Sequence, residues 1–131
     1  MSEINLSVNL CGIQLTNPAI LASGILGTTK ALLKRVAQNG AGAVTIKSIS
    51  VESREGHKNP TVITFEAGML NAVGYSNPGV DAAAREFTNL HDVGVPVIAS
   101  VIGTQKEDFV RVVDGLSAQR FSAIEIPLSC P

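Results

Sequence analysis

The sequence predicts an α/β fold in which short buried strands alternate with helices. The composition is 45% hydrophobic, with only 4% aromatic and 16% charged residues, as in proteins that bury parallel strands on both faces. Four short apolar runs, at 19–22, 43–46, 96–100 and 123–126, are each followed by small or polar residues. Helix-like segments separate these runs, which is the pattern of β-α-β units around a parallel sheet.

The chain is expected to begin with a small β-hairpin and then enter the first β-α unit. Residues 4–15 alternate apolar and polar around Cys11-Gly12, which is the period of a strand pair. Thr28 or Thr29 is expected to cap the helix that follows the first buried strand. Gly40 is expected to end that helix in the left-handed conformation.

A long excursion interrupts the second β-α unit. Residues 49–78 are rich in Gly, Pro, Asn and charge, and loops of this length are usually functional. Asn77-Pro78 is expected to start the next helix, with Pro at its first position, and Gly94 to stop it. Thr104 and Glu107 have the spacing of a capping box, which predicts the start of the last helix.

Two architectures fit this order of elements, the doubly wound sheet and the (β/α)₈ barrel. No G-x-G-x-x-G follows the first buried strand, which disfavours a dinucleotide-binding fold. The four strands end in Ser23-Gly24, Lys47-Ser48, Ser100 and Ser129-Cys130, and polar strand ends suit a barrel mouth. A complete barrel takes about 250 residues. Residues 1–131 are therefore expected to be one partial domain, the amino-terminal half of such a barrel, incomplete at its carboxyl end.

Charge and composition disfavour several classes of function. A formal net charge of −1 offers no basic patch, so no nucleic-acid partner is expected. No apolar run approaches the roughly 18 residues of a membrane span, so no membrane partner is expected. The amino terminus lacks the features of a secretory signal, which predicts a cytoplasmic protein. Cys11 and Cys130 lie far apart and have no metal-binding spacing, so reduced thiols and no metal site are expected.

Several short motifs follow one another along the chain. They are Asn17-Pro18 through Ala22-Ser23-Gly24, Thr45-Ile46-Lys47-Ser48, Asn59-Pro60-Thr61, residues 68–74, Asn77-Pro78-Gly79 and Ser129-Cys130-Pro131. In this order they resemble the amino-terminal half of the class 1 dihydroorotate dehydrogenases, most closely the class 1B catalytic subunit. The resemblance implies an FMN-containing barrel that oxidises dihydroorotate to orotate in pyrimidine biosynthesis. It also implies a partner subunit with FAD and a [2Fe–2S] cluster that passes electrons to NAD.

The resemblance also assigns roles to individual residues. Cys130 would be the general base that removes the C5 proton of the substrate while a hydride moves from C6 to the flavin. A free thiol has a pKa of about 8.5, so a thiolate at neutral pH needs help from its surroundings. The substrate-binding residues would be Lys47, Asn71, Met69 and Gly74, and the cofactor-binding residues Ser23, Lys47, Ser48 and Ser100.

Plainer interpretations of these residues stay open. On position alone, Cys130 is as consistent with packing as with chemistry. Lys47 could be a solvated lysine at a strand end, and Asn71 could be a turn former. The strand-end serines could simply satisfy backbone groups. His57 is expected to be exposed and idle, and His91 to interact with a helix dipole.

Other expectations concern the chain as a whole. Pro127 stands where the family pattern has Asn, so one side-chain amide contact is absent. An open half-barrel leaves apolar edges uncovered, so the chain is expected to be an inactive fragment that forms a homo-oligomer rather than an independent monomer. Two further functions remain: a non-catalytic half-barrel that pairs with itself or another chain, and an aldolase-type lyase that uses Lys47 as a Schiff base.

Overall fold

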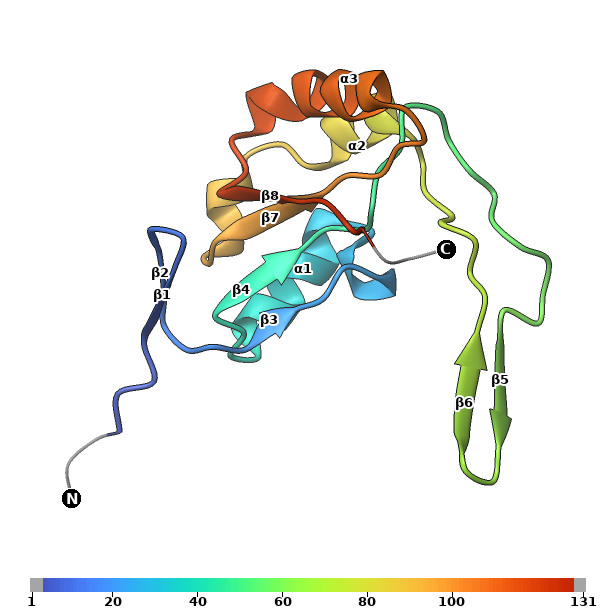
Figure 1. Cartoon of the computed structure of the whole chain (residues 1–131). Helices are drawn as coiled ribbons and strands as arrows, with labels where there is room; N and C mark the ends of the chain where they lie inside the picture. Colours follow the sequence, from blue (N-terminus) through green and yellow to red (C-terminus); the bar gives the residue numbers. More distant parts are fainter. Residues whose placement is uncertain (1–3, 129–131) are drawn as a thin grey trace.

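The structure is a computed structural model that describes residues 4–128 of the chain (Figure 1). In that part of the chain, a four-stranded parallel sheet is accompanied by two separate antiparallel hairpins. In chain order, with 3-10 helices written η, the elements are β1 (Val8–Leu10), β2 (Ile13–Leu15), β3 (Ile20–Leu21), η1 (Ile25–Gly27), α1 (Lys30–Gln38), β4 (Ala43–Thr45), β5 (Val62–Phe65), β6 (Gly68–Asn71), α2 (Val80–Glu86), η2 (Leu90–Val93), β7 (Val97–Ser100), α3 (Lys106–Leu116), η3 (Ser117–Gln119) and β8 (Ala123–Glu125).

The strands of the parallel sheet are arranged in chain order, β3-β4-β7-β8. Each new strand is added at the same edge, and this order does not reverse among the described strands. A doubly wound sheet binds its ligand where the strand order reverses, so this sheet offers no such switch point. The carboxyl ends of all four strands lie at one edge of the sheet, because the strands are parallel.

The two faces of the sheet are covered differently. Val44 and Ile46 project from one face into the main core, together with Phe87 of the segment after α2 and Val112 of α3. Ala43, which precedes Val44 and so points to the opposite side, belongs to a second, smaller apolar cluster on the other face. Helices α2 and α3 lie side by side over the first face (Figure 1).

The first helix begins as its sequence predicts. The Thr29 side chain accepts a hydrogen bond from the backbone N–H of Leu32 at 3.2 Å and caps α1. Gly40, at φ +95°, follows the end of this helix in the left-handed region. Thr29 rather than Thr28 is therefore the cap, because its extended backbone lets the hydroxyl reach the third residue ahead.

The other two helix starts differ from the prediction. Gly79, at φ +81°, is the cap of α2, and the Asn77 side chain accepts from the Gly79 N–H instead of starting the helix. Helix α3 is capped one residue later than expected, by Gln105 with Asp108 as its box partner. The Asp108 carboxylate accepts from the backbone N–H of both Thr104 and Gln105, so Asp108 rather than Glu107 is the acidic partner of the capping box.

The segment expected to form one helix up to Gly94 divides in two. Helix α2 ends at Glu86, and a 3-10 turn, η2, follows after Asn89, whose φ of +52° breaks the helix. Phe87 and Leu90 are nevertheless buried, so the apolar pattern places both side chains in the core without requiring one continuous helix.

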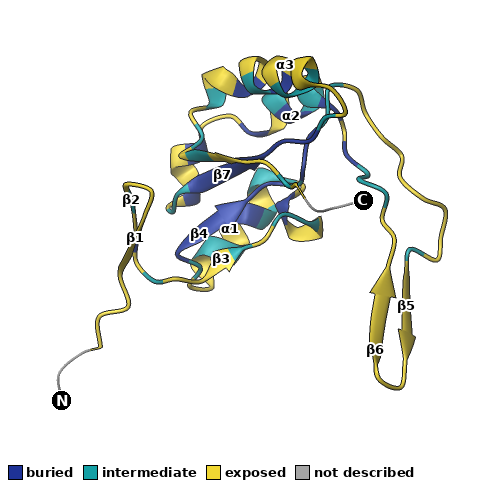
Figure 2. Cartoon of the chain, in the orientation of Figure 1, coloured by how far each residue is buried: buried dark blue, intermediate teal, exposed yellow. Residues whose placement is uncertain are grey.

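The long excursion contains a hairpin that the sequence prediction missed. Strands β5 and β6 pair antiparallel, with Val62 opposite Asn71 and Ile63 opposite Leu70. Figure 1 shows this hairpin projecting away from the parallel sheet, and Figure 2 shows that it is exposed along its length. The segment lacks the alternation of a half-buried strand, because neither of its faces packs on the core.

No helix within residues 4–128 has both the length and the apolar character needed to cross a membrane. Over the same residues, no three His, Cys, Asp or Glu side chains gather in a way that could hold a metal ion.

Candidate active-site cavity

A cavity of about 1090 Å³ lies between the carboxyl ends of the parallel strands and the β5–β6 hairpin. Ligand sites in α/β folds occupy this end of the sheet, because the loops that follow the strands converge there. The volume is slightly above the roughly 300–1,000 Å³ of typical small-molecule and cofactor sites. The lining residues are Ala22, Ser23, Gly24, Ile25, Thr28, Lys47, Ser48, His57, Thr61, Val62, Met69, Asn71, Ala72, Val73, Gly74, Tyr75, Ser76, Glu125 and Pro127.

The cavity brings together most of the candidate residues from the sequence. Those that line it are Ser23, Lys47, Ser48, Met69, Asn71 and Gly74. Ser100 does not line the cavity; it is fully buried and reaches the site through a hydrogen bond to Ser48. Cys130 lies outside the described residues, so its predicted role is untested by the geometry.

Lys47 is positioned by the turn that follows β4. Its backbone N–H donates to the carbonyl of Gly27 at 2.8 Å, which ties the end of β4 to η1. A Cβ on Gly27 would lie 2.5 Å from the carbonyl oxygen of Thr45, so only glycine allows this close approach. The Lys47 side chain is half-buried, and no carboxylate of the described residues pairs with it. Its ammonium group is therefore available to an anionic or electron-rich ligand.

Three serine hydroxyls form a continuous hydrogen-bonded chain at the strand ends. Ser23 Oγ lies 2.9 Å from Ser48 Oγ, which lies 3.0 Å from Ser100 Oγ. Ser23 follows β3, Ser48 follows β4 and Ser100 ends β7, so this row of hydroxyl groups crosses three neighbouring strands. It starts in the core and ends at the cavity wall.

The hairpin contributes the opposite wall. Met69 and Asn71 are two residues apart on β6, so both side chains are on the same face, and both line the cavity. Gly74 follows at φ +72°, and a Cβ there would lie 2.7 Å from Cδ2 of His57. Glycine at this position lets the chain turn tightly against the His57 ring.

Among the polar cavity residues that the sequence analysis did not assign to the site are His57 and Glu125. His57 is exposed, as expected, but it also lines the cavity and its N–H donates to the Val73 carbonyl at 3.1 Å. Glu125 ends β8 and lines the cavity as well. Its position at the end of an apolar run was a usable signal, whereas the charged loop around His57 offered none.

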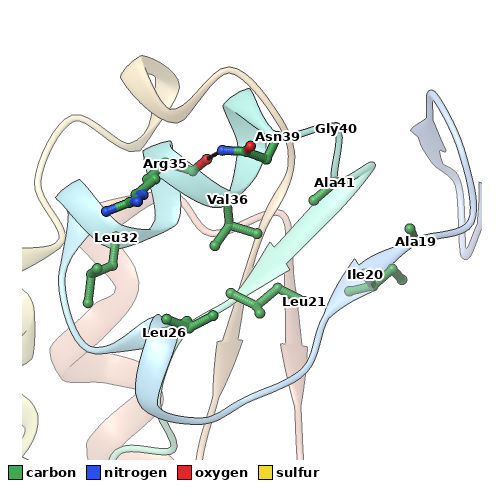
Figure 3. Close-up of a pocket in the computed structure, with 10 residues that line it drawn as sticks. All are labelled: Ala19, Ile20, Leu21, Leu26, Leu32, Arg35, Val36, Asn39, Gly40 and Ala41. Atoms are coloured by element: carbon green, nitrogen blue, oxygen red, sulfur yellow. Dashed lines mark hydrogen bonds between the residues drawn. The ribbon is translucent and has the colours of Figure 1, made fainter.

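A second hollow of about 670 Å³ lies along the free edge of the sheet, between β3 and α1 (Figure 3). Its walls are mainly apolar, with Leu21, Leu26 and Val36 directed into the space between strand and helix. Asn39 closes one end, where its side-chain amide donates to the Arg35 carbonyl at 2.7 Å. None of the candidate site residues lines this groove.

A parallel sheet with a cavity at its carboxyl edge, lined by apolar side chains and a few polar ones, defines the class of α/β proteins that bind a small ligand at the ends of their strands. A sequence model of the family described as dihydroorotate dehydrogenase matches residues 5–131. The chain therefore belongs to the dihydroorotate dehydrogenase family.

Curated relatives carry the same family name. Similar proteins are the "Dihydroorotate dehydrogenase B (NAD(+)), catalytic subunit" of Methanocaldococcus jannaschii, 44% identical over 135 residues, and that of Methanocella arvoryzae, 45% identical over 128 residues. These matches cover 100% and 98% of this chain, but only 44% and 42% of the relatives. The chain thus spans less than half the length of the curated relatives that it matches.

Proposed function

We propose that this chain is the amino-terminal half of an FMN-dependent dihydroorotate dehydrogenase, which oxidises dihydroorotate to orotate in pyrimidine biosynthesis. The observation that carries the proposal is the cavity, where Lys47, Asn71 and the serine hydroxyls of separate segments meet. Its size suits a planar ring system, and apolar side chains such as Val62 and Met69 offer surfaces for ring faces. FMN, when bound, would supply the acceptor for the two electrons that leave the substrate as hydride.

The residues of this chain would bind the substrate and move one proton. Lys47 would stabilise negative charge that develops at the pyrimidine ring of the cofactor. Asn71 would orient the planar substrate, since its amide both donates and accepts in one plane. Backbone N–H groups near Met69 and Gly74 would hold the substrate carboxylate. Each of these residues lines the same cavity.

Cys130 would be the general base that takes the proton from C5 of the substrate. Cys130 follows Pro127, which lines the cavity, by three positions in the sequence. A thiolate that takes this proton while hydride leaves C6 completes the double bond and balances the reaction. Pro127 has no side-chain amide that could contact the cofactor as the Asn of the family pattern would. Other polar groups of the cavity would have to provide that contact.

The fold supports a partial barrel as well. The strand order β3-β4-β7-β8 corresponds to the first four strands of a (β/α)₈ barrel, in which neighbours in sequence are neighbours in space. The groove beside β3 is apolar and lies at an open edge, where another β-α unit would pack. We propose that residues 1–131 form one half of the barrel and that the groove receives the part that completes it.

The partners are proposed on the same basis. The relatives are named catalytic subunits of an NAD(+) enzyme. We infer that a second subunit with FAD and a [2Fe–2S] cluster would take the electrons to NAD, and that the catalytic chain would form a homo-oligomer. The exposed apolar residues of the β5–β6 hairpin, among them Phe65 and Leu70, are a surface that association would cover.

The test uses residues 1–131 fused to the carboxyl-terminal remainder of the Methanocaldococcus jannaschii relative, here called the completed protein. With dihydroorotate and an artificial acceptor, it should form orotate. Cys130→Ser should slow the reduction of bound FMN by substrate by about 10²-fold or more, because a hydroxyl is a poorer base than a thiolate. Cys11→Ser is the matched control, because Cys11 is an exposed free thiol in the first hairpin.

Failure to form orotate with any acceptor, despite bound FMN, would refute the proposed activity. It would favour the alternative of a non-catalytic half-barrel that self-associates. Size-exclusion chromatography of residues 1–131 alone tests self-association, which both functions predict, so orotate formation by the completed protein is the measurement that separates them.

A further inference from the structure

A further cavity, here called the amino-end cavity, lies where strands β7 and β8 begin. Val97, the first residue of β7, and Ser122, which directly precedes β8, both line it. Its other lining residues come from η2, η3 and the positions that flank them, and none of the proposed active-site residues is among them. The volume is about 430 Å³, which is within the range of small-molecule sites. The chain therefore has a second space for a ligand, at the opposite end of the sheet from the candidate active site.

The amino-end cavity contains a cationic side chain without a partner. Arg120 lines the cavity, and among the described residues its guanidinium group makes neither an ion pair nor a hydrogen bond. The other basic residue of the lining, His91, is bonded through Nε2 to Oδ1 of Asp92 at 2.9 Å. No Asp or Glu side chain lines the cavity. The Arg120 guanidinium, which has only donors, is therefore available to an oxyanion.

The backbone of Arg120 has a conformation that usually belongs to glycine. Its φ is +55°, in the left-handed region, and it caps the end of η3. Residues with a side chain adopt this conformation at an energetic cost, and for that reason glycine is the usual residue just after a helix. Strained residues of this kind cluster at ligand-binding and active sites. An unpaired guanidinium group on a strained turn points to a binding role for this side chain.

The neighbouring residue, Gln119, adds a hydrogen-bond acceptor without a donor. Its Nε2 donates to the Ala84 carbonyl of α2 at 3.0 Å, which fixes the orientation of the amide group. Its Oε1 is buried and has no hydrogen-bond partner among the described residues. Leaving a buried acceptor unpaired is unfavourable, and burial screens this oxygen from bulk water. An O–H group held in the cavity that Gln119 lines would supply the missing donor.

We propose that the amino-end cavity binds a phosphate group with an O–H donor beside it, as hydrogen phosphate or a phosphorylated sugar carries. Two phosphate oxygens would accept from the planar guanidinium group of Arg120, and the O–H would donate to Oε1 of Gln119. Leu90 and Val95 also line the cavity and offer apolar contacts to the organic part of a larger ligand. The proposed oxidation of dihydroorotate uses none of these residues, so this inference is independent of it.

The test is isothermal titration calorimetry of the completed protein with inorganic phosphate, sulfate and ribose 5-phosphate, near neutral pH and at constant ionic strength. Sulfate resembles hydrogen phosphate in shape and charge but has no O–H group at this pH. It would leave Gln119 unpaired, so it should bind about tenfold or more weakly than phosphate. Ribose 5-phosphate that binds more tightly than inorganic phosphate would identify a phosphorylated metabolite as the ligand, whereas weaker binding would identify free phosphate.

Two variants assign the contacts to their residues. Arg120→Gly removes the guanidinium group and places at φ +55° a residue that adopts it without strain, so the protein should fold and lose phosphate affinity by about tenfold or more. Arg111→Ala is the matched control, because Arg111 is an exposed arginine of α3 that does not line the cavity. Gln119→Met should reduce phosphate affinity to that of sulfate and leave sulfate binding unchanged.

Three results would contradict the proposal. Absence of phosphate binding by the unmodified protein would overturn it, as would equal phosphate affinity in Arg120→Gly and Arg111→Ala. Equal affinity of the unmodified protein for phosphate and sulfate would overturn the assignment of Gln119 as the acceptor. Orotate formation by the same preparation is a separate measurement, so the proposed function can hold or fail whatever the outcome at the amino-end cavity.

Discussion

Gly27 is the position where one added methyl group should disturb the cavity most directly. This buried residue ends η1 and packs on the backbone of β4. In Gly27→Ala, the new Cβ would lie 2.5 Å from the Thr45 carbonyl oxygen, 2.7 Å from the Lys47 nitrogen and 2.8 Å from the Ile46 carbonyl carbon. All three are backbone atoms, so no side chain can rotate away. An ordinary contact would require η1 and β4 to separate by roughly 1 Å.

Two effects of different size follow from that separation. Overpacking of this kind typically costs about 1–3 kcal/mol of folding free energy. The hydrogen bond from the Lys47 N–H to the Gly27 carbonyl, now 2.8 Å long, would also lengthen. Lys47 and Ser48 would move with the end of β4, and a displacement of about 1 Å at a reacting centre can cost roughly 10²-fold in rate. The functional loss should therefore exceed what the loss of stability explains.

The assay combines urea denaturation with FMN affinity and orotate formation by the completed protein. Gly68→Ala is the matched control, because a Cβ on Gly68 would lie at an ordinary 3.5 Å from the Phe65 ring. It should leave FMN affinity and turnover unchanged. If Gly27→Ala had the stability, FMN affinity and turnover of the unmodified protein, the close approach between η1 and β4 would not control the site.

Two further predictions concern the segments that support the cavity. Asn77→Ala removes a 7% exposed amide that bonds Ser50 and nearby backbone groups, so it should cost about 2 kcal/mol in urea denaturation; a change near zero would contradict this. Hydrogen bonds from the backbone N–H groups of Thr104 and, secondly, Gln105 lower the pKa of Asp108 below its ordinary 3.8. The Asp108 carboxylate therefore stabilises the folded protein fully above pH 3.8, and this stabilisation is lost as the pH falls through the lowered pKa. Asp108→Asn should lower the melting temperature at pH 7, with the difference shrinking below pH 3.8; a difference that persisted unchanged in acid would refute the role of the charge.

The sequence by itself determined the elements whose signals are local. The positions of the four parallel strands, a cap at Thr28 or Thr29 and the polar residues at the strand ends all depend on neighbours within a few positions. The burial of the first and last of these strands was predicted wrongly: β3 and β8 are partly exposed, because they lie at the two edges of the sheet. Lys47 and Ser48 could be placed at the cavity edge because they directly follow an apolar run, and parallel strands end at one edge of the sheet. Asn71 and Gly74 were reached only through the resemblance to a family, since the hairpin around them has no distinctive pattern.

The tertiary structure decided which of these residues meet and in what role. Ser23 and Ser48 are separated by 25 positions, and Ser48 and Ser100 by 52, so their contacts depend on the register of three strands. The resemblance to the family predicts all three serines in a cofactor site, whereas packing buries Ser100 away from the cavity wall, where it bonds Ser48. Likewise, His57 lines the cavity because the chain turns at Gly74. Such relations between distant segments arise from packing, which no local pattern encodes.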